Sequence, residues 1–282
     1  LFMWDRLNAL ELPNLKVLKI DTQPNTAGGP DLFGVKRVPI QELSAKLSPF
    51  TNLLSLRLHV DFYKSYEFLS HLVHLEDLSI KHFKLPDNLQ VQLDVSCFPS
   101  LRSLNIGNID LLEAEVFINQ LPTLLHLSKL SFHSCLMDIT AIPVIANCKG
   151  LEGLRLDDLL FARHGAQGLD NQKIDLNELI SLVHLRKLSL QNAKLVNEDL
   201  SVIGQFLRLE SLDLRHSPKL SGNYLTLQNL QYLWYLNLRG AILDESAIEL
   251  FAKLSSLQNL IIQAVPLQNN LGSLERDEIH AA

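Results

Sequence analysis

Two adjacent carboxylates are the first candidates for chemistry in this sequence. Asp157 and Asp158 stand together, as the acid and the base of a hydrolytic pair would. They follow a short apolar stretch that predicts a β-strand, and consecutive strand residues point to opposite faces. The two carboxylates could then act on the same substrate atom only if the backbone departs from a regular strand. We therefore expect a solvated acidic edge, or a salt bridge to Arg155 or Arg186, in preference to catalysis.

The sequence contains none of the common catalytic or phosphate-binding motifs. It has no Gly-x-x-x-x-Gly-Lys-Ser/Thr loop, no His-Glu-x-x-His, no Gly-x-Ser-x-Gly and no Cys-x-x-Cys. We expect no basic group to activate Cys135 or Cys148 as a nucleophile, so both are predicted to be small core residues. The sequence therefore favours a protein that is not an enzyme and that holds no metal and no cofactor.

The elements that position these residues are copies of one repeated unit. The pattern Leu-x-x-Leu-x-(Leu/Ile/Phe) occurs ten times, starting at Leu15, Leu53, Leu75, Leu101, Leu127, Leu151, Leu185, Leu209, Leu233 and Leu257. The last three steps are 24 residues each. One unit has a single strand's worth of apolar residues pointing one way, so it buries them only by stacking on its neighbours. The sequence therefore predicts a solenoid.

Each unit predicts a short strand with two different faces. In the unit that begins at Leu185, the apolar residues Leu188 and Leu190 alternate with a polar residue. This period of two is typical of a strand, so stacked units form a parallel sheet with leucines inward and intervening residues outward. We expect one buried line of leucines, formed by Leu188, Leu212, Leu236 and Leu260.

Helical periodicity follows the strand where the sequence is clearest. Between Asn197 and Leu207, apolar residues fall at i, i+3, i+6 and i+7, after an asparagine able to cap a helix. The segments 138–148 and 244–254 repeat this pattern, with the expected inward residues Ile142, Ile145, Ile248 and Phe251. Helices on one side and closely spaced strands on the other bend the stack into an arc. The sheet then lies on the concave face, which is the expected binding surface.

Two steps of the repeat are longer than the others. The step from Leu15 to Leu53 is 38 residues and the step from Leu151 to Leu185 is 34. We assign the excess to insertions over 22–40 and 161–175, which are either tolerated surface loops or loops that touch a partner. The tail 268–282 is polar after Leu274.

The pattern resembles the leucine-rich repeat over roughly Leu12 to Leu267. The stretches 132–140, 145–151 and 214–220, which include Cys135 and Cys148, look like the cysteine-containing class of that repeat. The resemblance implies an α/β horseshoe of about ten repeats, with a parallel sheet on the concave face and helices on the convex face. It also implies that residues 1–282 form one domain.

The same resemblance implies that the chain recognises a protein partner through the concave face. The cysteine-containing class is common in F-box proteins, which implies the substrate-receptor part of a ubiquitin ligase with its F-box outside this sequence. The alternatives are a ligand-sensing array of an immune receptor or a pathogen effector, and a repeat protein that activates small GTPases. The last class usually has longer repeats with Asn in the slot that here holds Ala or Cys, which counts against it.

One cluster near the C-terminal end of the sheet is suited to partner binding. Strands of a sheet lie about 4.8 Å apart, so residues of the eighth and ninth repeats come together. Trp, Tyr and Arg dominate binding hot spots because they bury much area and still offer a hydrogen bond. The predicted partner-binding residues are Arg215, His216, Trp234, Tyr235, Asn237 and Arg239. The alternative is that Trp234 packs on the rim and the arginines are solvated.

Histidines occur without the spacing of a metal site. Three of them, His74, His126 and His184, occupy the slot directly before the first leucine of a repeat. They belong to alternate repeats, so stacking does not bring them together. Four others are expected to face the concave side, namely His59, His82, His133 and His216.

The composition of the chain bears on the class of partner and on the cellular location. The chain has 31 acidic and 25 basic residues and a net charge of -6, which disfavours nucleic acid as the main partner because phosphate binding needs a basic face. Three cysteines and no Asn-x-Ser/Thr site favour a reducing, cytoplasmic location. We expect no membrane association, because no apolar run approaches the roughly 20 residues of a spanning helix. We expect a fragment of a longer protein, since the repeats are already under way near Leu12.

Overall fold

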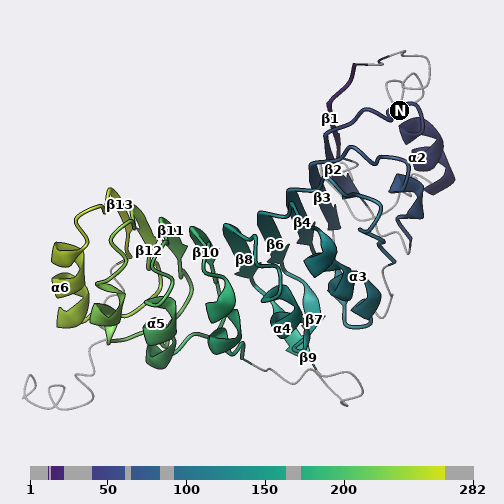
Figure 1. Cartoon of the computed structure of the whole chain (residues 1–282). Helices are drawn as coiled ribbons and strands as arrows, with labels where there is room; N and C mark the ends of the chain where they lie inside the picture. The colour runs from purple at the N-terminus through teal and green to yellow at the C-terminus, as the bar shows by residue number, and fades with distance from the viewer. Residues whose placement is uncertain are drawn as a thin grey trace, which may run out of the picture.

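Ten parallel strands form one sheet in the computed structural model (Figure 1). The structure describes residues 12, 14–21, 40–60, 65–82, 92–162 and 173–263. In sheet order the strands are β1 (Val17–Asp21), β2 (Ser55–Val60), β3 (Asp77–His82), β4 (Ser103–Gly107), β6 (Lys129–His133), β8 (Gly153–Asp157), β10 (Lys187–Ser189), β11 (Ser211–Asp213), β12 (Tyr235–Asn237) and β13 (Asn259–Ile261). Each strand begins two residues after the first leucine of its repeat. The predicted solenoid of ten leucine-rich repeats is therefore confirmed.

The register of the sheet places the same repeat position side by side in every strand. The central leucines pair in one row, formed by Leu18, Leu56, Leu78, Leu104, Leu130, Leu154, Leu188, Leu212, Leu236 and Leu260. Leu188, Leu212 and Leu236 are buried, as predicted. Leu260 is only half-buried, because β13 ends the sheet in the described part of the chain.

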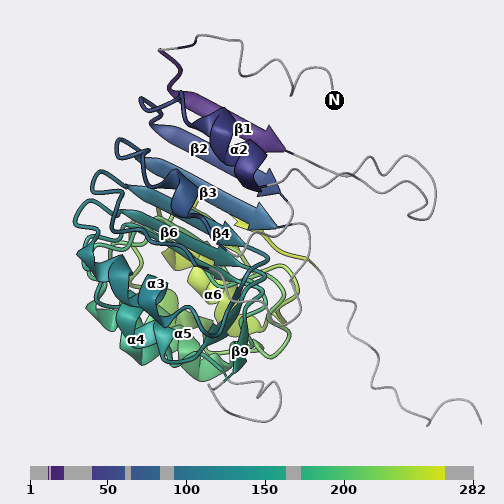
Figure 2. The same ribbon diagram turned by 90° about the vertical axis from the view of Figure 1, so that its right-hand side faces the viewer.

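Short helices and single turns cover the other side of the sheet. They are α2 (Ile40–Leu47), η2 (Glu67–Leu69), α3 (Glu115–Gln120), η3 (Leu121–Thr123), α4 (Ala141–Ile145), η4 (Leu176–Ser181), α5 (Asn197–Ile203), η5 (Tyr224–Leu227) and α6 (Glu245–Lys253), where η marks a 3-10 helix. A second parallel sheet joins the middle repeats through β5 (Asp110–Leu111), β7 (Leu136–Asp138) and β9 (Leu160–Ala162). Figures 1 and 2 show α3 to α6 along one side of the row of strands. The predicted convex helices exist, and they are shorter than the periodicity indicated.

The start of α5 differs from the prediction that Asn197 caps it. The Asp199 carboxylate accepts a hydrogen bond from the Val196 backbone N–H at 2.7 Å, which ties the first turn to the residue before it. Asn197 instead reaches the next repeat, where its Oδ1 accepts a hydrogen bond from the Ser221 backbone N–H at 2.9 Å. The asparagine therefore joins repeats, and the acidic residue in the first turn stabilises the helix start.

Three of the four helix residues predicted to face inward do so. Ile142 and Ile145 are buried and Phe251 is half-buried. The prediction is wrong for Ile248, whose side chain is 69% exposed. The preceding residue, Ala247, is buried in its place, because the start of α6 sets the helix face one position earlier than the apolar pattern indicated.

Both predicted insertions and the tail fall mainly outside the described residues. Of 22–40, only residue 40 is described, as the start of α2; of 161–175, residues 161–162 end β9 and residues 173–175 lead into η4. The tail 268–282 lies wholly outside them. All three assignments stay predictions.

A residue in the left-handed backbone region follows six successive strands of the sheet, β4 to β12. These residues are Asn108, Ser134, Asp158, Asn192, His216 and Gly240, with φ of 51° to 59° for the first five and 86° for the glycine. The backbone N–H of each of the first five donates to a carbonyl of the next strand's end, as from His216 to Arg239 at 2.7 Å. The chain therefore leaves the sheet by the same turn in each of these repeats.

We expect Leu212→Ala to lower the free energy of unfolding by about 2–5 kcal/mol, through lost burial and the cavity left behind. Leu212 is fully buried in the middle of the leucine row. Urea unfolding followed by circular dichroism measures the change. A loss below about 1 kcal/mol would contradict the continuous core, since a buried leucine truncated without consequence is not packed.

Gly240→Ala should lower the free energy of unfolding by about 1–2 kcal/mol, because a side chain at positive φ is strained. The new Cβ also lies 3.4 Å from the His216 backbone. Gly153→Ala is the matched control, since its added Cβ meets only side chains of ordinary contact distance, at 3.6 Å and beyond. Equal effects of the two substitutions in the same unfolding measurement would argue against a conformational role for Gly240.

Candidate functional site

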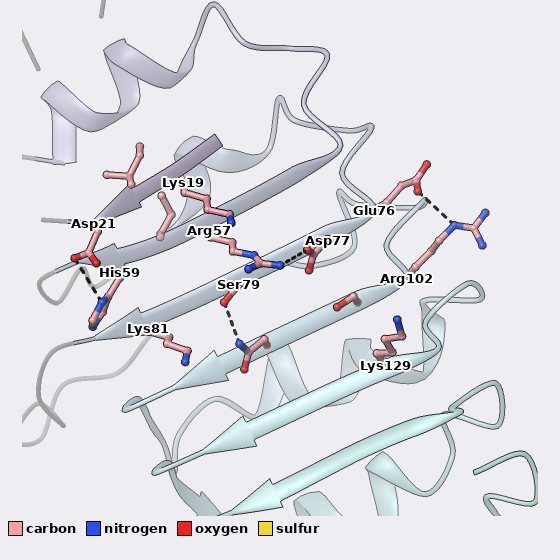
Figure 3. Close-up of a pocket in the computed structure, with 14 residues that line it drawn as sticks. Lys19, Asp21, Arg57, His59, Glu76, Asp77, Ser79, Lys81, Arg102 and Lys129 are labelled. Carbon is pink, nitrogen blue, oxygen red and sulfur yellow. Dashed lines mark hydrogen bonds and ion pairs between the residues drawn. The ribbon is translucent and has the colours of Figure 1, made fainter. Parts of the chain in front are cut away.

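The outward face of the sheet is hollowed along its length. A hollow of about 730 Å³ lies over β4 to β12, and small outward residues, among them Ser131, Gly153, Ser189 and Ser211, form its floor. A second hollow of about 660 Å³ over β1 to β6 shares Ser103, Asn105 and Lys129 with the first (Figure 3). The two hollows form one surface, which we call the concave groove.

Arginines in the groove pair with carboxylates. The pairs are Arg57 with Asp77 at 3.6 Å, Arg102 with Glu76 at 3.6 Å, Arg215 with Asp213 at 2.7 Å, Arg186 with Glu210, and Arg155 with Asp157. Figure 3 shows the first two. The hydrogen bond to Asp213 raises the pKa of Arg215, whose guanidinium is therefore fixed in place as well as charged. Pairing holds these side chains as walls of the groove.

Asp157 lies beneath the groove and is fully buried. Its carboxylate accepts hydrogen bonds from Arg155 Nε, from Ser189 Oγ at 2.7 Å and from the Gln191 backbone N–H at 2.9 Å. Asp158 turns away in the left-handed region and accepts from Gln191 Nε2 at 2.9 Å. The predicted salt bridge to Arg155 is confirmed, and the prediction of a solvated edge is wrong for Asp157. Its carboxylate accepts three hydrogen bonds, and the bond from Ser189 connects β8 to β10.

His82 is buried, so the prediction that it faces the groove is wrong. It ends β3 on the same side as Leu78 and Ile80, which are core residues. The Tyr66 hydroxyl lies 2.5 Å from His82 Nε2. Burial lowers the pKa of His82 to about 4, which keeps the ring neutral at pH 7.

His133 and His59 lie on the groove side, as expected. The ring of His133 covers Gly107 on the neighbouring strand, so closely that a Cβ at Gly107 would come within 2.1 Å of it. Burial first, and then the charges of Lys81 and Arg155, lower the pKa of His133 to about 4. His133 is therefore neutral at pH 7 and lies over Gly107 on the outward side of the sheet. His59 pairs with Asp21 at 3.5 Å (Figure 3).

The predicted partner-binding residues are spread along β12 and its neighbour. Arg215 and Tyr235 line the hollow itself. The Tyr235 ring packs edge-on against Trp234, with ring centroids 5.9 Å apart. Trp234 is 37% exposed and directly precedes β12, so it lies at the rim.

The other three residues have different surroundings. Asn237 is only 3% exposed: its Oδ1 accepts from the Arg239 backbone N–H at 3.1 Å and its Nδ2 donates to the Tyr235 hydroxyl at 3.4 Å. Asn237 thus supports its neighbours and offers little surface of its own. Arg239 is exposed, and its Nε donates to Gln263 Oε1 at 2.9 Å. His216 is exposed in the left-handed turn at the far edge of the sheet from Trp234.

The sequence analysis missed the centre of the groove. Lys129, Gly153 and Lys187 occupy one row of the sheet and line the larger hollow. Their signal in the sequence is the outward slot two residues after the first leucine, where small and charged residues alternate from the second repeat to the eighth. Because residues in this slot lie side by side in the sheet, comparing them between repeats predicts the floor of the groove.

Groups suited to other chemistry are scarce in the described residues. Within them, no set of three or more His, Cys, Asp or Glu side chains is placed to hold a metal ion. Cys97, Cys135 and Cys148 form no disulfide, and burial raises the pKa of the last two thiols to about 12. Cys135 and Cys148 are core residues, as predicted. No helix of the described ranges has the length and apolarity to cross a membrane.

The chain is similar to several solved structures at low sequence identity, and one of them has a TM-score above 0.5. The protein in the crystal structure of a TLR13–ssRNA13 complex is 20% identical, with a TM-score of 0.54 over 91% of this chain and 33% of that one. An internalin from Listeria monocytogenes is 18% identical, with a TM-score of 0.48 over 76% of this chain and 62% of its own. A leucine-rich-repeat protein from Leptospira interrogans is 18% identical, with a TM-score of 0.46 over 79% and 62%.

No protein-family model matches the sequence, and no curated protein sequence is similar to it. The chain spans about a third of the TLR13 chain and less than two thirds of the internalin. At 20% identity the likeness to the TLR13 structure concerns the fold alone. The fold of this chain is that of a leucine-rich-repeat solenoid.

Stability should fall between pH 7 and pH 4 partly through His82. The unfolded histidine takes up a proton below about pH 6.5, whereas the buried one does so only near pH 4. Proton uptake by the unfolded state therefore favours unfolding as the pH drops through this window. His82→Gln, which does not titrate, should remove up to about 3 kcal/mol of this pH dependence.

Urea unfolding at pH 4, 5, 6 and 7 measures this effect for the parent and the variant. His74→Gln is the control, because His74 is exposed. Parallel curves of unfolding free energy against pH for the parent and His82→Gln would show that His82 is not held neutral by the fold.

Proposed function

We propose that this chain is a protein-recognition module and that its concave groove binds a protein partner. The groove itself supports this: it runs along the sheet, its floor contains small residues, and its walls are held by ion pairs. A small-residue floor lets a partner approach closely, and fixed charged walls give it specificity. Tyr235 and Arg215 then contribute the ring and guanidinium groups that dominate hot spots.

We propose binding without catalysis and without a cofactor. The carboxylate best placed by sequence, Asp157, already accepts three hydrogen bonds and is shielded from solvent. The thiols of Cys135 and Cys148 are buried with raised pKa values, which disfavours the nucleophilic thiolate. These groups stabilise the repeats, whereas the exposed groups of the groove are suited to contact.

For the cellular setting we propose the substrate-receptor part of a ubiquitin ligase in the cytoplasm. Two observations support this setting: Cys135 and Cys148 occupy buried repeat slots as in the cysteine-containing class, and the three cysteines are free thiols. Co-purification of the full-length protein with the F-box-binding adaptor of a cullin ligase tests this setting. Absence of the adaptor from the purified full-length protein would remove the ligase role and leave the recognition role intact.

Tyr235→Ala and Arg239→Ala should each weaken partner binding by about 1–4 kcal/mol, because rings and guanidinium groups at a contact surface carry much of the binding energy. The melting temperature should stay nearly unchanged, since both side chains lie outside the leucine core. A photo-crosslinking residue at Ser211, on the floor of the groove, identifies the partner. Calorimetry with the purified partner then measures the loss.

Glu249→Ala is the control, because Glu249 is exposed on α6, on the other side of the sheet. It should change neither affinity nor melting temperature. Full affinity in both the Tyr235→Ala and the Arg239→Ala variants, with a crosslink from Glu249 in place of Ser211, would move the binding surface to the convex side and contradict the proposal.

A further inference from the structure

The lysines of the concave groove carry charge that its carboxylates do not neutralise. Each groove arginine named above faces an acidic partner, so those charges are already balanced. Within the described residues, no carboxylate forms an ion pair with Lys19, Lys81, Lys129 or Lys187. Glu152 also has no ion pair there, and its charge acts on Arg186. The groove is therefore left with excess positive charge, although the whole chain carries -6.

Two of these lysines flank a glycine. Lys129, Gly153 and Lys187 pair in register on β6, β8 and β10, and both lysines are exposed. A Cβ at Gly153 would lie 3.6 Å from Lys129 Cγ and 4.0 Å from Lys187 Cβ, so the lysine stems border the space that the glycine leaves open. Because strands lie about 4.8 Å apart, the stems start roughly 10 Å from each other. The two flexible ammonium groups can then converge on one anion above the notch.

We propose that this notch receives a carboxylate side chain of the partner, and that the partner lies along the groove as an extended acidic segment. The inference rests on the proposed protein-binding function. The larger hollow runs over β4, β6, β8, β10, β11 and β12. Six strands span about 24 Å, the length of roughly seven extended residues. Lys19 and Lys81 continue the positive charge over the first strands (Figure 3).

An acidic peptide fits this surface better than a nucleic acid does. Glu76, Asp77, Glu152 and Glu210 line the same groove between the cations, so an unbroken row of phosphates would meet them. A peptide can place neutral residues opposite those carboxylates. Single-stranded nucleic acids also need several rings for base stacking. Among the described residues that line the two hollows, Tyr235 supplies the single phenol ring, with no Phe or Trp beside it.

Selection of a displayed library of random seven-residue peptides on the purified chain tests this inference. At low salt we expect the recovered sequences to be enriched in Asp and Glu over the input library. A fluorescein-labelled copy of the strongest binder should bind the double variant Lys129→Gln/Lys187→Gln at least about tenfold more weakly than the parent. Raising the salt should weaken parent binding, because these lysines are solvent-exposed.

The matched control is Lys219→Gln/Lys253→Gln, which removes the same charge from two exposed lysines outside the groove. It should bind the peptide like the parent, and all variants should share one melting temperature. A groove-blocking variant, Gly153→Trp, distinguishes peptide binding in the groove from carboxylate binding between Lys129 and Lys187. Peptides that lose binding to Gly153→Trp and keep it with Lys129→Gln/Lys187→Gln would overturn the acidic notch and leave the groove as a binding site.

Recovered peptides that bind Gly153→Trp as well as the parent would instead count against the groove itself. Selection of no peptide above background would also overturn the acidic segment. A fluorescein-labelled ten-nucleotide oligo(dT) serves as the competing probe. Tighter binding of that probe than of the strongest peptide, lost in Lys129→Gln/Lys187→Gln, would make the groove a nucleic-acid surface and overturn the proposal.

Discussion

Stacking of one repeat on the next is the constraint on which the rest of this structure depends. A single strand has no partner of its own for its inward leucine, so Leu188, Leu212 and Leu236 are buried only by each other and by their neighbours. The backbone enforces the register: the Glu210 carbonyl accepts from the N–H groups of both Trp234 and Tyr235, one repeat later. A shift by one residue would turn every leucine to solvent. The groove exists because this register leaves the alternate residues on the other face.

Left-handed turns and a buried hydrogen-bond network stabilise the edge of the sheet where its strands end. Six successive strands leave it through a left-handed residue, which gives these repeats a common exit. In the middle of that edge Asp157 gathers Arg155, Ser189 and Gln191 from two strands. Removing water from a carboxylate is costly unless hydrogen bonds replace it, and here they do. Buried hydrogen bonds therefore stabilise the groove walls together with apolar packing.

The strands and the core were predictable because their signal is local and repeated ten times. The role of Asn197 and the environment of Asp157 were not, because each depends on a contact with another repeat. Asp157 and Ser189 are 32 residues apart in the sequence. His82 was predicted to face the groove, although it stands two residues after the inward Ile80. The alternation of strand side chains places both residues on the same, buried face. The lysines beside Gly153 were overlooked because their neighbours in the sheet lie in other repeats.

Side chains alternate between the inward and the outward face of each strand, and substitutions at the two kinds of position have different effects. Substitutions at inward positions such as Leu212 change whether the chain folds, and those at outward positions such as Gly153 and Lys187 change what the surface presents. Because the two sets interleave along each strand, neighbouring residues are under different physical constraints: one must pack in the core and the next only shapes the surface. A lineage with this fold can redesign its recognition surface one outward residue at a time, from repeat to repeat, while the scaffold stays intact.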